Sequence, residues 1–182
     1  MPRPAEARRG DTARDAVQDA VAQDGTAVAE ARPAAGFETV RTWDLHSSSE
    51  LSTLRAQLMA ALTSEGHQQG TDLDDVPNRL VLIASELATN AIEHGLPPTT
   101  VTLSRSATEF LLEVADHDLG QPPVFATGRG FGEGGIGMRL TQRLSAAMGW
   151  YQDGLAKTVW ATFPRHVGPS LPDRAPGEPG QG

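Results

Sequence analysis

Apolar and polar residues follow regular periods in the middle of the chain, from residue 37 to residue 163. The clearest period lies in residues 78–95, where apolar residues recur every three or four positions and predict a helix. Pro77 suits the first turn of such a helix, and Gly95, followed by two prolines, suits its end. The apolar residues of the stripe are Leu80, Ile83, Ala84, Leu87 and Ala91.

The segments on either side of this helix also have clear patterns. Residues 37–45 alternate in a way that predicts an edge strand, and residues 51–66 carry leucine and alanine at helical spacing. Residues 99–104 and 109–116 predict two strands joined by a short polar turn.

A glycine-rich region separates these elements from the last ones. Residues 118–135 contain six glycines and two prolines, which is typical of a lid or a binding loop. Apolar spacing from Ile136 onward predicts a helix that ends at Gly149. Asp153-Gly154 predicts the turn of a closing hairpin that ends near residue 163.

These elements predict an α+β fold. We expect a two-layer sandwich in which a mixed β-sheet is covered on one face by three helices, formed by residues 37–163. Residues 1–36 carry too little bulky apolar surface to offset the entropy of ordering, which predicts a disordered arm. Residues 164–182 are rich in Pro and Gly, which predicts a disordered tail.

Composition excludes several classes of function. The 182 residues carry a formal net charge of −8, which argues against a general nucleic-acid binder and against an anionic membrane surface as partner. The chain has no cysteine, so it has no disulfide framework and no thiolate zinc site. No stretch approaches the ~18 apolar residues of a membrane span, and the N-terminus has no apolar run typical of a secretory signal. We therefore expect a cytoplasmic protein.

Candidate chemistry begins on the helix of residues 78–95. Glu86 and Asn90 lie four residues apart, so their side chains stack at the border of the apolar stripe. A carboxylate and a carboxamide in this arrangement could hold a divalent cation and orient a nucleophile. An isolated pair of this kind is more often a solvated edge, so the motifs that follow are what give it weight.

Two further motifs follow in order. Asp116 has the parity of the apolar residues in 109–116, so we expect it on the covered face of the sheet, where a carboxylate suits the amino group of adenine. An Asp that ends a strand can also be a simple turn residue. The glycines of residues 134–138 open a helix, where free backbone N–H groups allow a phosphate to come close.

Together these motifs resemble the ATP-binding domain of the GHKL superfamily, and most closely its anti-sigma-factor serine/threonine kinases. The resemblance covers nearly all of residues 37–163. It implies a histidine-kinase-like ATPase fold, with ATP and Mg²⁺ bound. It also implies two partners, a sigma factor that the protein sequesters and a small antagonist protein that it phosphorylates. A homodimer is left open, and we do not expect a sensor histidine kinase, because no histidine-bearing dimerisation helix is evident.

The resemblance implies roles for individual residues. Residues 86–94 match the N box, with Glu86 as general base and Asn90 as Mg²⁺ ligand. His94 closes this box and is assigned to the nucleotide site, with a core or helix-end role equally open. Asp116 and Gly120 match the first glycine box, which binds adenine.

The remaining matches concern the triphosphate and a late strand. The second glycine box, beneath the triphosphate, corresponds to Gly135, Ile136, Gly137 and Met138. Thr158 matches a threonine that supports the adenine site, although strand parity gives it an inward direction only through a bulge or a shift.

Two departures from the family pattern keep a rival function open. Asp118 stands where the first box normally has Gly, and Glu133 stands where kinases often have a basic residue; Arg129 or Arg139 could replace it. These departures favour an ATP-dependent regulatory binding module without phosphotransferase activity, whereas Glu86 favours the kinase. An ATPase with no protein acceptor is a weaker third hypothesis.

Overall fold

Helices and strands follow one another in nearly the predicted order. The computed structural model describes residues 28–67, 75–120, 122–123 and 136–165. The elements are β1 (Glu38–Leu45), the short 3₁₀ helix η1 (Ser48–Glu50), α2 (Leu51–Ser64), α3 (Val76–His94), β2 (Thr99–Arg105), β3 (Glu109–Asp116), α4 (Ile136–Leu144), β4 (Ala147–Gln152) and β5 (Lys157–Pro164).

The five strands form one sheet in the order β1-β2-β3-β5-β4. All four strand pairs are antiparallel, so the α+β class is confirmed while the sheet is antiparallel rather than mixed. The short turns that join β2 to β3 and β4 to β5 explain part of this difference, because a tight turn can join only antiparallel neighbours. Within the described residues, the one parallel pairing is an isolated bridge between Glu30 and Trp150.

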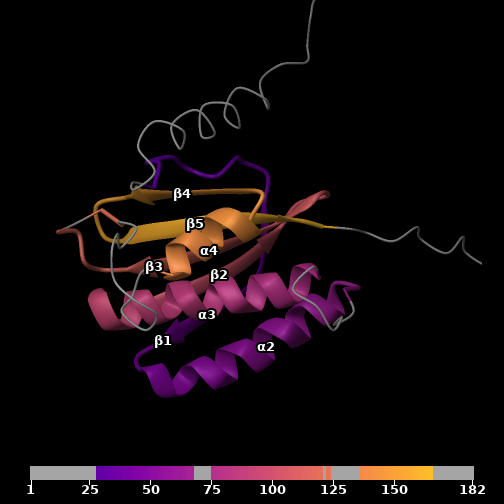
Figure 1. Ribbon diagram of the computed structural model, residues 1–182, viewed down its shortest axis with the longest axis horizontal. Helices are drawn as coiled ribbons and strands as arrows, with labels where there is room; N and C mark the ends of the chain where they lie inside the picture. The colour runs from indigo at the N-terminus through magenta and orange to yellow at the C-terminus, as the bar shows by residue number, and fades with distance from the viewer. Residues whose placement is uncertain (1–27, 68–74, 121, 124–135, 166–182) are drawn as a thin grey trace, which may run out of the picture.

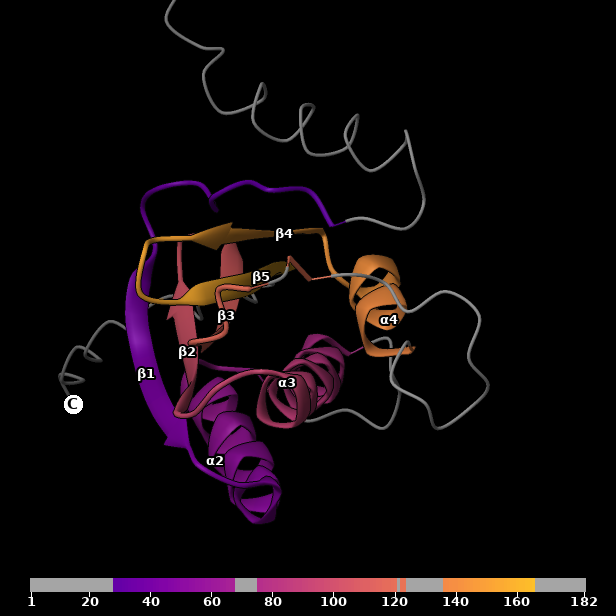
Figure 2. The ribbon, with the colours of Figure 1, turned by 90° about the vertical axis from the view of Figure 1, so that its left-hand side faces the viewer.

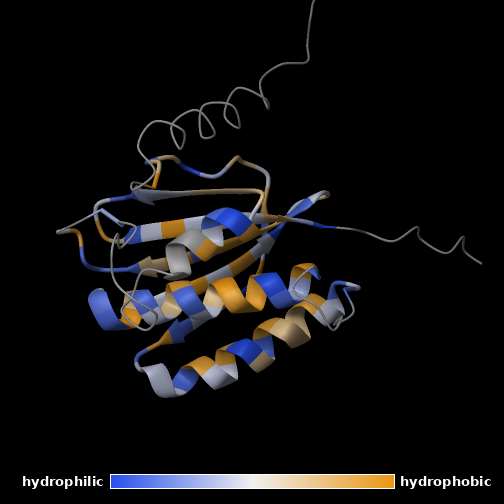
Figure 3. Ribbon diagram, in the orientation of Figure 1, coloured by the Kyte–Doolittle hydropathy of each residue, from blue (hydrophilic) through white to orange (hydrophobic). Residues whose placement is uncertain are grey.

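The three helices lie on one face of the sheet, as predicted (Figures 1 and 2). The apolar stripes of α2 and α3 are buried between the layers, and the alternation of apolar and polar residues along both helices is visible in Figure 3. The sheet contributes inward-facing side chains such as Phe110, Leu112 and Phe163, which are fully buried. This packing holds α3 against the centre of the sheet, where β2, β3 and β5 contact it.

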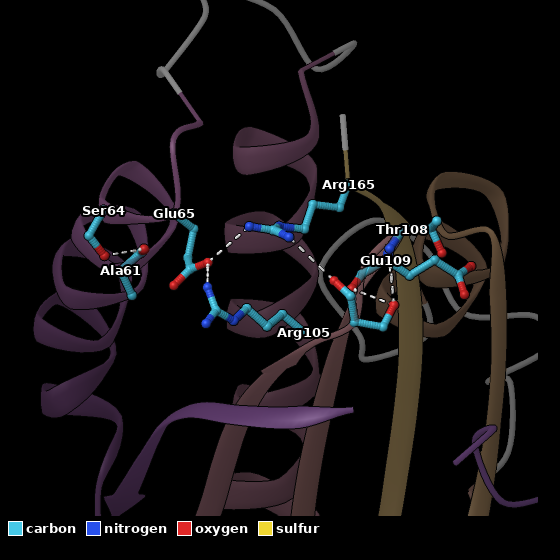
Figure 4. Close-up of polar contacts among 8 residues, drawn as sticks. Ala61, Ser64, Glu65, Arg105, Thr108, Glu109 and Arg165 are labelled. Atoms are coloured by element: carbon cyan, nitrogen blue, oxygen red, sulfur yellow. Dashed lines mark hydrogen bonds and ion pairs between the residues drawn. The ribbon is translucent and has the colours of Figure 1, made fainter. Parts of the chain in front are cut away.

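A part-buried ionic cluster connects the C-terminal end of α2 to one end of the sheet (Figure 4). The Glu65 carboxylate, which directly follows α2, pairs with Arg105 at the end of β2 and with Arg165 after β5. The Arg165 backbone N–H donates to the Thr108 carbonyl at 2.7 Å. Arg165 therefore belongs to the packed structure, although the domain was expected to end at residue 163.

Helix α4 ends at Leu144, five residues before the predicted end at Gly149. The Thr141 carbonyl accepts from both the N–H and the hydroxyl of Ser145, at 3.0 and 2.6 Å. The next residue, Ala146, donates its N–H to Thr162 of β5 at 2.8 Å. The chain thus joins the sheet at once, and Ala147, which fits the helical spacing equally well, begins β4.

Residues 28–36, expected within a disordered arm, lie along the edge of β4 and across the face of the sheet that the helices leave open (Figure 2). The N–H of Trp150 donates to Ala29, and the N–H of Ala31 donates back to Trp150, at 3.0 and 2.8 Å. The indoles of Trp150 and Trp160 donate to the carbonyls of Val28 and Ala31, at 3.1 and 2.6 Å. The packed structure therefore includes residues 28–36, which lie before the expected boundary at residue 37.

The same face carries a half-buried polar pair beneath this segment. The Tyr151 hydroxyl donates to the Glu113 carboxylate at 3.0 Å, and the Arg32 guanidinium lies 4.2 Å from the centre of the Tyr151 ring. Burial raises the pKa of Glu113, against the opposing effects of the Tyr151 hydrogen bond and the Arg32 charge. Burial also raises the pKa of Tyr151, and the neighbouring Glu113 adds to that shift.

We predict that the N-terminal segment contributes to stability. Val28→Ala should lower the free energy of unfolding by about 1.5 kcal/mol, because the side chain is buried and each buried carbon contributes ~0.8 kcal/mol. Urea denaturation measures this loss. A truncation before residue 37 should be less stable than one before residue 28, and equal stability of these two truncations would contradict the role of residues 28–36.

We also predict that ionisation of Glu113 destabilises the folded state. The raised pKa means that the folded state keeps this proton to higher pH than the unfolded state. Stability should therefore fall as pH rises from the ordinary glutamate value of about 4.3 through the raised one. Glu113→Gln should remove this decline in urea denaturation at a series of pH values, with Glu93→Gln on the surface of α3 as the control for loss of a charge. An unchanged pH dependence in Glu113→Gln would contradict the prediction.

Candidate functional site

Helix α3 presents the first two candidate residues on its flank. Glu86 and Asn90 are half-buried, beside the fully buried residues Leu87 and Ala91 that face the sheet. They lie one helical turn apart, as the sequence predicts, with their side chains at the border between the core and solvent.

The C-terminal end of α3 comes very close to the end of β3. A Cβ atom on Gly95 would lie 2.6 Å from the Asp116 Cγ and 2.5 Å from the Ala91 carbonyl oxygen. The chain then turns, and the His117 N–H donates to the Leu96 carbonyl at 3.1 Å. Gly95 thus lets the helix end and the strand end meet at a distance that no other residue allows.

Asp116 lies at this meeting point and is buried, as its parity predicts. Its Oδ1 accepts the N–H of Asp118 at 2.8 Å and lies 3.5 Å from the Lys157 Nζ. The Asp118 carboxylate in turn accepts the N–H of Gly120 at 2.9 Å. The side chain of Asp118, which replaces the usual glycine, is therefore used within the turn, where it binds the Gly120 N–H. Gly120 itself is exposed.

Helix α4 forms the other side of this region and packs against α3 and β4 (Figure 2). Its backbone begins at Ile136, so Gly137 and Met138 lie in its first turn, where N–H groups have no partner within the helix. Gly135, the preceding member of the predicted glycine box, lies outside the described residues. The predicted loop from Asp118 also falls largely outside them.

Two predicted residues do not join this group. His94 ends α3 with 67% of its side chain exposed, and its Nε2 lies 4.0 Å from the Glu93 carboxylate. Thr158 is buried but pairs with Ala115 and Tyr151, without a bulge. It therefore faces the side of the sheet away from Asp116, and the inward direction proposed for it does not occur.

No site role was predicted from the sequence for two residues that lie close to the Asp116 side chain, Lys157 and Gly95. Lys157 pairs directly with Asp116 in the antiparallel register of β3 and β5, so both side chains share one face. The hairpin turn at Asp153-Gly154 fixes only the register of β4 with β5, so no local signal in the sequence places Lys157, rather than Thr158, opposite Asp116. Gly95 was interpreted only as a helix end.

Comparison with protein-family models matches residues 47–163 to the histidine kinase-like ATPase domain. The chain belongs to the histidine kinase-like ATPase family. No curated protein sequence matches it. The match begins just before α2 and ends in β5, so residues 28–46 lie outside it although β1 and the segment across the sheet pack against it. Domains of this family bind ATP, generally with Mg²⁺, and no helix in the described part of this chain is long and apolar enough to cross a membrane.

The residues present fit a magnesium ion held largely by the nucleotide. Within the described ranges, no three His, Cys, Asp or Glu side chains are grouped to hold a metal. Mg²⁺ commonly takes one or two protein oxygens and completes its shell with phosphate oxygens and water. The half-buried carboxamide of Asn90 would hold the ion in this ATPase domain, where the ion neutralises phosphate charge.

We predict that Gly95→Ala in this ATPase domain disrupts the site specifically. The added Cβ overlaps the Asp116 side chain, so the variant should lose about 1–3 kcal/mol of stability and bind ATP at least tenfold more weakly. Thermal unfolding and calorimetric titration measure the two effects.

Gly149→Ala provides the matched control. Its Cβ would lie 2.8 Å from the Trp160 ring on the other face of the sheet, so it should destabilise the protein without weakening ATP binding. Equal losses of ATP affinity in the two variants would show that Gly95 acts through global stability alone.

Proposed function

We propose that this protein is an ATP- and Mg²⁺-dependent serine/threonine protein kinase that phosphorylates a small antagonist protein and sequesters a sigma factor. The observation that carries the proposal is the position of Glu86 and Asn90, half-buried on the helix whose final glycine packs against Asp116. Membership of the histidine kinase-like ATPase family supports the ATP site. The resemblance of the three motifs to anti-sigma-factor kinases supports the acceptor and the partners.

In the proposed reaction, each residue has a separate task. Asp116 accepts a hydrogen bond from the amino group of adenine, and the N–H groups in the first turn of α4 donate to the triphosphate. The acceptor hydroxyl oxygen forms a bond to the γ-phosphorus as the bond to the β–γ bridging oxygen breaks, which releases ADP. Glu86 takes the hydroxyl proton. Positioning and charge neutralisation carry most of such a transfer, so one carboxylate base and a dipolar phosphate site are a sufficient protein contribution.

A regulatory binding module without phosphotransferase activity is the second candidate. In this reading the same site binds ATP, and bound nucleotide controls which protein partner is held. Asp118 and Glu133, which depart from the kinase pattern, favour it. The two candidates differ in whether Glu86 acts on an acceptor hydroxyl.

Two substitutions one turn apart separate these candidates. Asn90→Ala should abolish Mg²⁺-dependent ATP binding. Glu86→Gln keeps the shape and removes the base, so it should leave ATP affinity within a few-fold and slow phosphorylation by ~10²–10⁴-fold. Incubation with labelled ATP, Mg²⁺ and candidate antagonist proteins measures the rate, and calorimetry measures ATP and GTP affinity.

Glu93→Gln is the control, since it removes a carboxylate from the exposed side of the same helix. Sigma-factor binding without phosphorylation of any acceptor by the wild type would favour the binding module. Loss of ATP affinity in Glu86→Gln as severe as in Asn90→Ala would remove Glu86 from the role of base. Equal affinity for ATP and GTP would count against Asp116 as the adenine acceptor.

A further inference from the structure

Lys157 lies next to Asp116, whereas the family resemblance assigned the neighbouring Thr158 to the adenine site. Its Nζ lies 3.5 Å from the Asp116 Oδ1, and the two side chains are only 11% and 7% exposed. Their strands are in register at this pair, so both side chains point to the helix-covered face. Lys157 is also the only lysine in the sequence. A cation thus stands beside the carboxylate that is expected to bind adenine.

The two oxygens of Asp116 are used differently. Oδ1 meets both the Asp118 N–H and the Lys157 ammonium. In the part of the chain that the structure describes, Oδ2 of Asp116 makes no hydrogen bond or ion pair. An amino group can therefore donate to Oδ2 without displacing the Lys157 ammonium from Oδ1.

We propose that Lys157 is a second base-reading residue, which donates to N1 of adenine while Asp116 accepts from the 6-amino group. This inference rests on the ATP site of the proposed function. On the edge of adenine, the amino donor and the N1 acceptor are neighbours. Asp116 and Lys157 offer the complementary acceptor and donor side by side, in a buried place where each unmatched polar group is costly.

The pair also discriminates against guanine. In the same orientation, guanine presents its O6 acceptor to the Asp116 carboxylate and its N1–H donor to the Lys157 ammonium. An acceptor then faces the Asp116 carboxylate, which is itself an acceptor, and a donor faces the Lys157 ammonium, which is itself a donor. The buried polar groups of both side chains are left without hydrogen-bond partners on the base. Sites that read a ligand by buried hydrogen bonds reject the mismatched analogue far more strongly than apolar pockets do.

The test combines a variant with an altered ligand. The ligands are ATP and 1-deaza-ATP, in which a C–H group replaces N1, and calorimetry measures their affinities for the wild type and for Lys157→Met. The wild type should bind 1-deaza-ATP roughly tenfold or more weakly, the effect of losing a hydrogen bond to a charged group. Lys157→Met should bind ATP weakly and lose nothing further with 1-deaza-ATP. Thr158→Val, a buried change on the opposite face of the same strand, should retain the wild-type preference.

A measurement on the wild type covers the case in which Lys157→Met does not fold. Because Lys157 is the only lysine, its acylation by an amine reagent can be followed by mass spectrometry of one peptide. Saturating ATP should slow this reaction more than saturating 1-deaza-ATP. Equal protection by the two ligands would overturn the assignment.

The outcomes separate this inference from the function on which it rests. A 1-deaza penalty that persists in Lys157→Met would overturn the role of Lys157 and leave ATP binding intact. Absence of ATP binding by the wild type would overturn the nucleotide site itself, and with it both proposals. Phosphoryl transfer enters none of these measurements, so loss of kinase activity alone affects neither result.

Discussion

The contact between the end of α3 and the end of β3 is the constraint on which the site depends. It is possible only because Gly95 has no side chain, since a Cβ would lie 2.6 Å from the Asp116 Cγ. The His117 N–H bond to Leu96 fixes the turn that follows. This contact brings the end of the helix that carries Glu86 and Asn90 against the Asp116 side chain. Gly95, which the sequence identifies as a helix end, thus also permits the close approach at the centre of the candidate site.

Two ionic groups, one part-buried and one buried, lie at opposite ends of β3 and have different consequences. At one end, Glu65 meets two arginines, Arg105 and Arg165, so its charge is compensated twice and the end of α2 is held firmly. At the other end, Asp116 meets the single cation of Lys157. A buried pair adds little net stability, but loss of one partner costs about 3–5 kcal/mol, because a charge is left alone. Among the described residues, the second pair leaves the Asp116 Oδ2 without a hydrogen bond or ion pair.

Packing of the outer face explains why the fold extends beyond the family match. Three helices cover only one face of the five-stranded sheet, and the other carries Trp160 and the half-buried Glu113–Tyr151 pair. Residues 28–36 supply carbonyl partners for the indole N–H groups of Trp150 and Trp160. Trp160 lies on this otherwise open face and its indole requires such a partner, whereas Trp150 pairs with Val159 on the helix-covered face. These contacts make the segment part of the domain, despite its low content of large apolar residues.

The sequence by itself determined most of the fold and where three candidate residues lie in it, Glu86, Asn90 and Asp116. Periodicity located α2, α3, β2 and β3 within one or two residues, because the helices each bury an apolar stripe and the strands are rich in apolar residues between clear turns. Parity alone placed Asp116 in the core. Tertiary structure decided the features that depend on contacts with residues far along the chain, namely the end of α4 and the residue beside Asp116. Ala147 fits a helix as well as a strand, and only Thr162 of β5, which binds the preceding residue, ends α4. Likewise, only the pairing of β3 with β5 places Lys157 rather than Thr158 beside Asp116, because a shift of one residue turns a side chain to the other face of a sheet.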